Sequence, residues 1–352
     1  MRIGLLAESE LPLKVLDDLA PALEQKLTSE ADDGIEWTTV VARESVPLDD
    51  DGRIPLDAYA AELRGRLGCD MLVYLSDLPR LVDHAAFVAD LMPEHRAVLI
   101  SGPSLGLALR QRTRKTVLAA VKALVEGDDD ALSDRPGATD RALGPVRRTI
   151  RVDDGNVMLQ VTGLRGYTRL LLGMVRTNRP WRLAPALSSA TAAAAGTGAF
   201  GIFYSSIWSM AHASSPLRLA LVGLLAIAVM STWLIAYNGL WERDGLAPGT
   251  VIHNASMLAT VTAAVAMMYV LLYLLILVGA LAVIDGEYMS QQLGEPASLV
   301  DYLALAWLSA SMGMVAGALG STWDGDQDVR EAVFSRRTYQ RRAQTSGWEK
   351  SG

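Results

Sequence analysis

The sequence contains little cysteine and little histidine, which limits the chemistry that the chain can support. Cys69 is the only cysteine among 352 residues, which excludes an internal disulfide and any metal site made of several cysteines. The histidines are scattered and form no H-E-x-x-H pair; they are His84, His95, His212 and His253. We therefore expect no zinc site and no bound cofactor.

The first residues also lack the apolar core of roughly 7–15 residues, followed by a cleavage site, that defines a signal peptide. We therefore expect the N-terminal half to stay on the side of the membrane where it is made. The formal net charge of −7 offers no basic surface for a nucleic acid, so we expect no such partner. The Ala- and Arg-rich composition is similar to that of proteins from high-GC bacteria.

Charge is distributed unevenly along the chain. Residues 1–140 contain 26 Asp and Glu against 15 Lys and Arg, whereas residues 141–352 contain 13 against 17. The second half also holds four long apolar runs that are almost free of charge, at about 187–211, 216–240, 255–284 and 300–322. About 20 helical residues cross a hydrocarbon layer of about 30 Å, so each run is long enough for one span. The pattern predicts an all-α membrane domain of four transmembrane helices over residues 183–323.

The first run contains a match to the dinucleotide-binding pattern G-x-G-x-x-G, formed by Gly196, Gly198 and Gly201. That pattern needs a preceding strand and a helix that opens at the glycines, and here the glycines lie inside an apolar run instead. Small residues at a spacing of four let helices approach closely. We therefore interpret these glycines, with Gly313 and Gly317 in the fourth run, as helix-packing positions that also favour a homo-oligomer.

Arginines near the ends of the runs predict the orientation in the membrane. They cluster before the first run, at Arg165, Arg169, Arg176, Arg179 and Arg182, and after the fourth, at Arg330, Arg336, Arg337, Arg341 and Arg342. The positive-inside rule then places both termini in the cytoplasm of an inner-membrane protein, with residues 324–352 as a basic tail.

Residues 164–182 read as a basic juxtamembrane helix. Leu170, Leu171, Met174 and Val175 lie among its arginines, which suits a helix that lies on an anionic inner leaflet of the bilayer. An ordinary amphipathic helix that packs on the N-terminal domain is an equally good interpretation, and both stay open.

The N-terminal part, residues 1–126, alternates short apolar runs with helix-length segments. The expected strands are 2–7, 35–42, 71–75 and 97–100, and the expected helices are 12–27, 57–67, 83–91 and 107–125. Such alternation predicts an α/β domain with a flavodoxin- or Rossmann-like parallel sheet in three layers. Residues 127–163 read as a linker and a β-hairpin that turns at Asp153-Asp154-Gly155.

Two candidate ligand sites follow the expected strands, because open α/β sheets bind ligands beyond the carboxyl ends of their strands. The first is an anion site for a phosphorylated ligand, formed by Ser101, Gly102, Ser104, Gly106 and Arg110. The second is a site for a divalent cation, formed by Glu8, Glu10 and Asp77. For either set an ordinary turn is the stronger interpretation, and no catalytic group stands out at a defined spacing.

We therefore expect an integral inner-membrane protein whose cytoplasmic α/β domain binds a protein partner or a small ligand, phosphorylated or not, in a regulatory, scaffolding or assembly role. Two alternatives stay open. One is a channel or transporter gated by the cytoplasmic domain, although the runs lack the buried charges typical of coupled transporters. The other is a membrane-bound enzyme that acts on a lipid or a phosphorylated metabolite.

Overall fold

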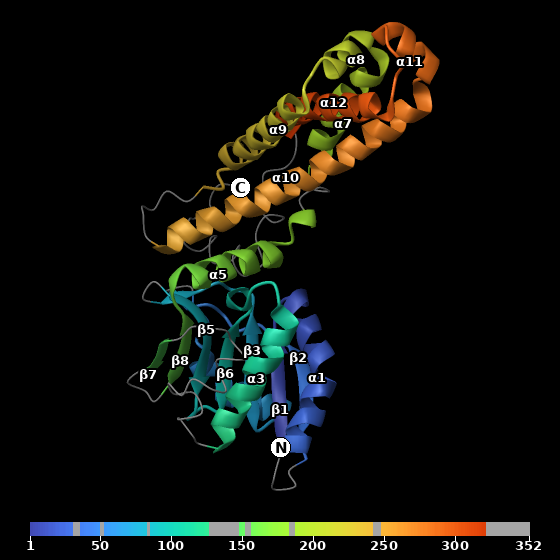
Figure 1. Cartoon of the computed structure of the whole chain (residues 1–352). Coiled ribbons are helices and arrows are strands. Elements are labelled where there is room, and N and C mark those ends of the chain that lie inside the picture. The colour runs from blue at the N-terminus through green and yellow to red at the C-terminus, as the bar shows by residue number, and fades with distance from the viewer. Residues whose placement is uncertain are drawn as a thin grey trace. The chain divides into compact units, whose positions relative to one another are not determined.

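The chain folds into two compact units (Figure 1). The computed structural model describes residues 1–30, 36–49, 53–82, 85–126, 148–151, 156–182, 187–241 and 248–321. The first unit, called the α/β unit here, is formed mainly by residues 1–177, and the second, the helical unit, mainly by residues 178–334. The expected linker at 127–147, the hairpin turn and the basic tail lie outside the described residues.

One mixed sheet forms the centre of the α/β unit. Its strands are β1 (Arg2–Ala7), β2 (Thr38–Arg43), β3 (Met71–Ser76), β4 (Leu81–Val82), β5 (Ala85–Met92), β6 (Ala97–Ser101), β7 (Arg148–Arg151) and β8 (Val157–Val161). They follow the order β2-β1-β3-β6-β5-β8-β7, with β4 paired to β5 outside that order. The four expected strands are β1, β2, β3 and β6, and they are mutually parallel.

The expectation of a wholly parallel sheet is wrong, because β5 is antiparallel to both β6 and β8, and β7 is antiparallel to β8. The error comes from residues 83–91, which were expected to form a helix, whereas Ala85–Met92 is strand β5 with every side chain buried. A short, continuous apolar run does not distinguish a buried strand from a helix. The tight turn at 93–96, with Arg96 at a φ of 45°, returns the chain directly into β6 and so fixes the antiparallel pairing.

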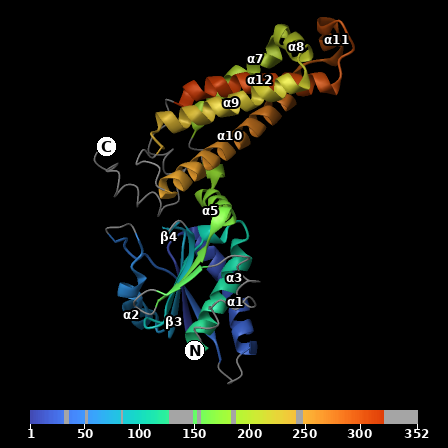
Figure 2. The ribbon, with the colours of Figure 1, turned by 60° about the vertical axis from the view of Figure 1, so that its left-hand side comes forward.

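Helices cover both faces of this sheet. The helices of the unit are α1 (Glu10–Glu30), α2 (Leu56–Leu67), the 3₁₀ turn η1 (Pro103–Leu105), α3 (Leu109–Glu126) and α5 (Gly163–Asn178). Figure 2 shows α2 on one side of the sheet and α1 with α3 on the other. Each side has its own apolar core, with Leu5, Val73 and Val98 facing α1 and α3, and with Leu72 and Leu99 facing the side of α2.

Helix α5 closes the carboxyl edge of the sheet. Two glycines allow the close approach, since a Cβ added to Gly173 would lie 1.9 Å from the backbone oxygen of Pro103, and one added to Gly166 would lie 2.5 Å from that of Val161. Between these glycines, Leu170 and Met174 enter the core on the side of α1 and α3. The apolar face of α5 is therefore part of the α/β core, as the second of the two interpretations of residues 164–182 required.

The helical unit contains the helices that follow the 3₁₀ turn η3 (Pro180–Arg182). They are α7 (Ser188–Phe203), α8 (Ser205–His212), α9 (Pro216–Tyr237), α10 (Pro248–Val283), α11 (Gly286–Leu293) and α12 (Leu299–Gly320). Among the described residues, three helices are long and apolar enough to cross a membrane, namely α9, α10 from Thr250, and α12. Large apolar side chains such as Leu221, Leu225, Leu271, Leu275 and Val278 are exposed on them, as a hydrocarbon solvent requires.

The expectation of four spans is therefore wrong for the first run. The backbone leaves the helical conformation at Tyr204, with φ −109° and ψ 106°, and this divides the run into α7 and α8. The 16 residues of α7 extend about 24 Å, which is shorter than the hydrocarbon layer. An uncharged run shows that a segment tolerates lipid, but it does not show that the segment is one continuous helix.

Helices α7 and α12 pack antiparallel and very closely. A Cβ added to Gly313 would lie 2.4 Å from the backbone oxygen of Ala194, and one added to Gly317 would lie 2.9 Å from that of Ala190. Going the other way, Gly201 lies against the side chain of Ser309. Four of the five glycines expected to pack helices are thus packed within the helical unit, and the faces that carry them are not available to a second copy. Gly196 is the exception, because it is exposed and a Cβ there would meet no atom within 4 Å.

Substitution of a packing glycine tests this contact. We expect Gly313→Leu to destabilise the helical unit by about 1–3 kcal/mol, because the new side chain meets the backbone of α7. Ala228→Leu is the control, since Ala228 is exposed on α9. Thermal unfolding of the two variants in detergent would contradict the described packing if they lost stability equally.

Candidate functional site

The Ser101–Gly106 loop, predicted as an anion site, lies buried where β3 and β6 end. The Ser101 hydroxyl donates a hydrogen bond to the Leu78 carbonyl oxygen at 3.0 Å, and the Ser104 hydroxyl donates to the Ser101 hydroxyl at 3.4 Å. The amide of Gly102 donates to the Ser76 carbonyl oxygen at 2.8 Å. These serines therefore join the ends of two strands, and α5 lies over the loop.

Two arginines lie beside the end of this loop. Gly106 has a φ of 69°, and a Cβ there would lie 2.9 Å from the Arg169 side chain and 3.1 Å from Nη1 of Arg112. Arg112 itself donates a hydrogen bond to the Leu105 carbonyl oxygen at 2.7 Å. Burial, together with the nearby Arg112, lowers the pKa of Arg169 to about 10, so the Arg169 guanidinium is still charged at neutral pH. The end of the loop at Gly106 thus lies beside two arginine side chains.

The structure brings together four of the five residues expected to bind an anion. The exception is Arg110, which forms an exposed ion pair with Asp18 at 2.5 Å. Arg112 could have been found from the sequence, since it is two residues beyond Arg110 on the same helix. Arg169 could not, because it reaches the loop from α5, more than sixty positions away in the sequence.

The residues of the expected cation site do not converge on a common point. Glu8 and Asp77 are buried and Glu10 is exposed at the start of α1. Among the residues that the structure describes, no group of three or more His, Cys, Asp or Glu side chains is placed to hold a metal ion. The carboxyl ends of β1 and β3 therefore do not form the three-carboxylate cluster that the sequence suggested.

A second polar group lies on the sheet face that α2 covers, and no pattern in the sequence indicates it. Asp90 is 7% exposed and sits opposite Leu99 and Met158 in the sheet, on the same face as Phe87. The Arg80 guanidinium stacks 4.8 Å from the Phe87 ring centre. Burial raises the pKa of Asp90 to about 6, although the charge of Arg80 opposes the shift.

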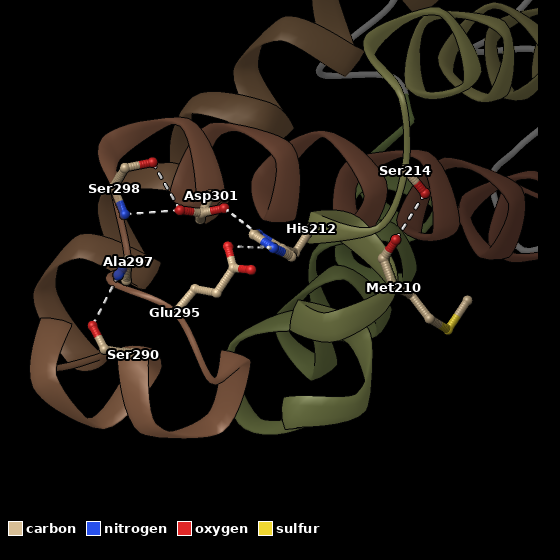
Figure 3. Close-up of polar contacts among 8 residues, drawn as sticks. All are labelled: Met210, His212, Ser214, Ser290, Glu295, Ala297, Ser298 and Asp301. Carbon is tan, nitrogen blue, oxygen red and sulfur yellow. Dashed lines mark hydrogen bonds and ion pairs between the residues drawn. The ribbon is translucent and has the colours of Figure 1, made fainter.

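A third polar group lies in the helical unit, where α8, α11 and α12 meet (Figure 3). His212 lies between two carboxylates, with Nδ1 2.7 Å from Oδ1 of Asp301 and Nε2 3.8 Å from Oε2 of Glu295. The other oxygen of Asp301 accepts hydrogen bonds from the amide and the hydroxyl of Ser298, each at 2.8 Å. Asp301 therefore caps α12 and holds α8 at the same time.

The hydrogen bond that Asp301 accepts from the His212 ring raises the pKa of His212 above its ordinary value, and the charges of Asp301 and Glu295 act in the same direction. A histidine with a raised pKa stabilises the folded state below its unfolded pKa, and this contribution is lost as the pH rises through the folded value. The contact between α8 and α12 is therefore expected to weaken as the pH rises above the pKa of His212 in the folded state.

No family model, curated protein or solved structure matches the chain. The three polar groups therefore carry the functional proposal. The Ser101–Gly106 loop joins the most elements, since β3, β6, α3 and α5 all contribute residues or cover to it.

Asp90 should destabilise the α/β unit at neutral pH. A raised carboxyl pKa means that the folded state binds a proton more tightly than the unfolded state, so stability falls as the pH rises from about 4 to about 6. We expect Asp90→Asn to raise the free energy of unfolding by about 1–3 kcal/mol above that window and to change it little below.

The buried thiol of Cys69 provides the measurement, because it is the only cysteine and becomes reactive when the α/β unit unfolds. Urea titrations of the full chain, followed by thiol labelling, compare Asp90→Asn with Asp17→Asn at an exposed position on α1. If both variants had the same free energy of unfolding at every pH, the pKa of Asp90 would not be raised in the folded state.

The raised pKa of His212 is tested by a pH titration that follows its ring by nuclear magnetic resonance. We expect Asp301→Asn to lower the titration midpoint of His212, because it removes the hydrogen bond and a charge at 2.7 Å. Glu295→Gln serves as the control and should have the smaller effect, since that carboxylate is 3.8 Å away and exposed. An unchanged midpoint in Asp301→Asn would rule out the contact.

Proposed function

We propose that this chain is an integral inner-membrane protein whose α/β unit binds a protein partner or a small phosphorylated ligand at the cytoplasmic surface, in a regulatory, scaffolding or assembly role. The observation that carries the proposal is the closure of the sheet's ligand edge by α5, the last long helix before the helical unit in the chain. A ligand or partner that changed the packing at this edge would act on α5 and on the segment that enters the membrane.

The membrane location is supported by the three long apolar helices and by the arrangement of the helical unit. Ser189 and Gly320 lie side by side, so the chain enters and leaves this unit at one end. At the other end lie α8 and α11, with the acidic residues Asp285, Glu287 and Glu295 (Figure 1). α7 and α8 together run beside the whole of α12, from Ser189 against Gly320 to His212 against Asp301, so the chain reaches the far end of the unit before α9, although neither helix is long enough to span alone. The arginines flank the first end, so we place it, and with it both termini, at the cytoplasmic side.

The choice of a phosphorylated ligand follows from the guanidinium groups at the Ser101–Gly106 loop. Arginine binds phosphate by paired, charge-assisted hydrogen bonds, and both Arg112 and Arg169 are at this loop. A closed edge excludes water, which strengthens such contacts, but it requires α5 to shift when a ligand enters. Ligand binding and α5 movement are therefore linked in the proposal.

A comparison of two arginine variants tests this function. The full-length protein in nanodiscs would be screened against phosphorylated metabolites extracted from its own cells, with thermal stabilisation as the signal. We expect Arg112→Gln to lose most of the stabilisation and Arg114→Gln to retain it, because Arg114 is exposed on the same helix. One lost charge-assisted hydrogen bond of about 1.5–3 kcal/mol corresponds to a loss of about tenfold to a hundredfold in affinity.

The alternative ligand in the proposal, a protein partner, is tested by mass spectrometry of the proteins that copurify from the native membrane. Absence of any stabilising metabolite and of any specific partner would refute a binding role. Turnover of a lipid or metabolite by the pure protein would refute it as well, in favour of an enzyme.

A channel or transporter is the second candidate, and buried polar contacts inside the helical unit favour it. The Tyr269 hydroxyl lies 2.9 Å from that of Ser311, and Asn178 donates a hydrogen bond to Thr260 at 3.2 Å. Hydroxyl and amide groups can line a pore that contains no charge. Ion flux into liposomes that contain the pure protein, abolished by Tyr269→Phe with Ser311→Ala, would support this function over the first.

A homo-oligomer remains part of the proposal, through those of the expected small residues that α12 does not cover. Ala192 and Gly196 are exposed on the outer side of α7, at the spacing that favours close helix association. The mass of the protein in nanodiscs measures this directly, and a monomer at all protein concentrations would contradict it.

A further inference from the structure

Helix α5 has a second apolar stripe on the side that faces away from the α/β core. At 100° per residue, the buried residues Gly166, Leu170, Gly173 and Met174 share one side of the helix. The opposite side carries what we call the outer stripe, which consists of Leu164, Thr168, Leu171, Leu172 and Val175. Leu164 is 79% exposed and Leu172 is 45% exposed, so these side chains are not buried in the core of the α/β unit.

Positive charge borders this outer stripe along one edge. Arg165 is exposed beside Leu164, and Arg176 lies half-buried near the other end of the helix, where it donates a hydrogen bond to the carbonyl oxygen of Leu107. Leu107 is itself largely exposed. The sequence contains no Asp or Glu between Asp154 and Glu242, so no acid on α5 offsets the arginines. An aliphatic stripe with a basic border is the composition of a helix that lies in a lipid headgroup layer.

Chain connectivity holds this stripe near lipid. α5 ends at Asn178 and α7 begins at Ser188, and ten residues span at most about 35 Å. α7 packs along α12, which is one of the helices long and apolar enough to cross a membrane. Whatever the orientation of the α/β unit, the C-terminal end of α5 therefore stays within reach of the membrane surface.

We propose that the outer stripe of α5, with Arg165 and Arg176, binds the headgroup layer of an anionic membrane. This inference rests on the proposed membrane function and adds lipid as a ligand of the α/β unit. Since the inner side of α5 closes the Ser101–Gly106 loop, one helix then contacts the membrane on one side and the ligand edge of the sheet on the other. Anionic lipid thereby holds the edge closed, and a ligand that enters the edge works against lipid binding.

The other occupants that such a stripe could have are a protein partner and a second copy of this chain. Lipid is favoured because the stripe carries only aliphatic side chains and a threonine beside arginines, without acids that would pair with a basic partner surface. Lipid is also the only one of the three that the connectivity of the chain keeps at high local concentration. The experiment below separates the three occupants.

A single fluorophore on the stripe provides the test. In a full-length Cys69→Ala background, Leu164→Cys is labelled with an environment-sensitive dye and reconstituted in nanodiscs of phosphatidylcholine, alone or mixed equally with phosphatidylglycerol. Contact with lipid is read from quenching by a spin label on the lipid headgroup. Glu94→Cys is the matched control, because it is exposed in the β5–β6 turn at the opposite edge of the sheet.

We expect headgroup quenching at position 164 in the mixed nanodiscs, weaker quenching without the anionic lipid, and none at position 94. A basic side chain near an anionic surface contributes about fivefold to the docked-to-undocked ratio, so Arg165→Gln should lower that ratio by about this factor.

Three results would overturn the inference. The first is a dye at position 164 that remains in water in both lipid mixtures. This result would leave the proposed membrane location intact, because the protein would still require the nanodisc. Shielding without headgroup quenching would identify a protein surface as the occupant. Shielding that appears only at high protein density would identify a second copy.

Discussion

The structure depends most on the requirement that a backbone in hydrocarbon must satisfy its own hydrogen bonds. Helices α9, α10 and α12 meet that requirement, and they expose leucines and valines that water would not tolerate. Because lipid provides little hydrophobic drive between helices, their association has to come from close packing. The glycines of α7 and α12 supply it, since Gly198, Gly201, Gly313 and Gly317 bring two backbones nearly into contact.

Close packing through glycines occurs again where α5 meets the sheet in the α/β unit. Gly173 and Gly166 allow α5 to close the edge at which open α/β sheets bind ligands, and Leu170 anchors the helix in the core. The closed edge contains a loop of mutually bonded serines next to Arg112 and Arg169. The Ser101–Gly106 loop, α5 and the helical unit are thus linked through α5, and this connection supports the regulatory or scaffolding role that we propose.

Periodicity in the sequence was enough to predict the α/β class, strands β1, β2, β3 and β6, and the location of the long apolar helices. It failed at Ala85–Met92, where a continuous apolar run fits either a strand or a helix and only the turn to β6 decides. It failed again at Tyr204, because lack of charge does not reveal a break in a helix. The site was only half predictable: the loop follows a strand end, whereas Arg169 and the His212–Asp301 pair depend on contacts between distant segments.

The most direct test of the account is the sidedness of two introduced cysteines. In a Cys69→Ala background, Glu94→Cys reports on the α/β unit and Glu295→Cys on the end of the helical unit that carries α8 and α11. A maleimide that does not cross membranes should label position 94 only in inside-out vesicles and position 295 only in right-side-out vesicles. Labelling of both positions from the same side would contradict a helical unit that crosses the membrane.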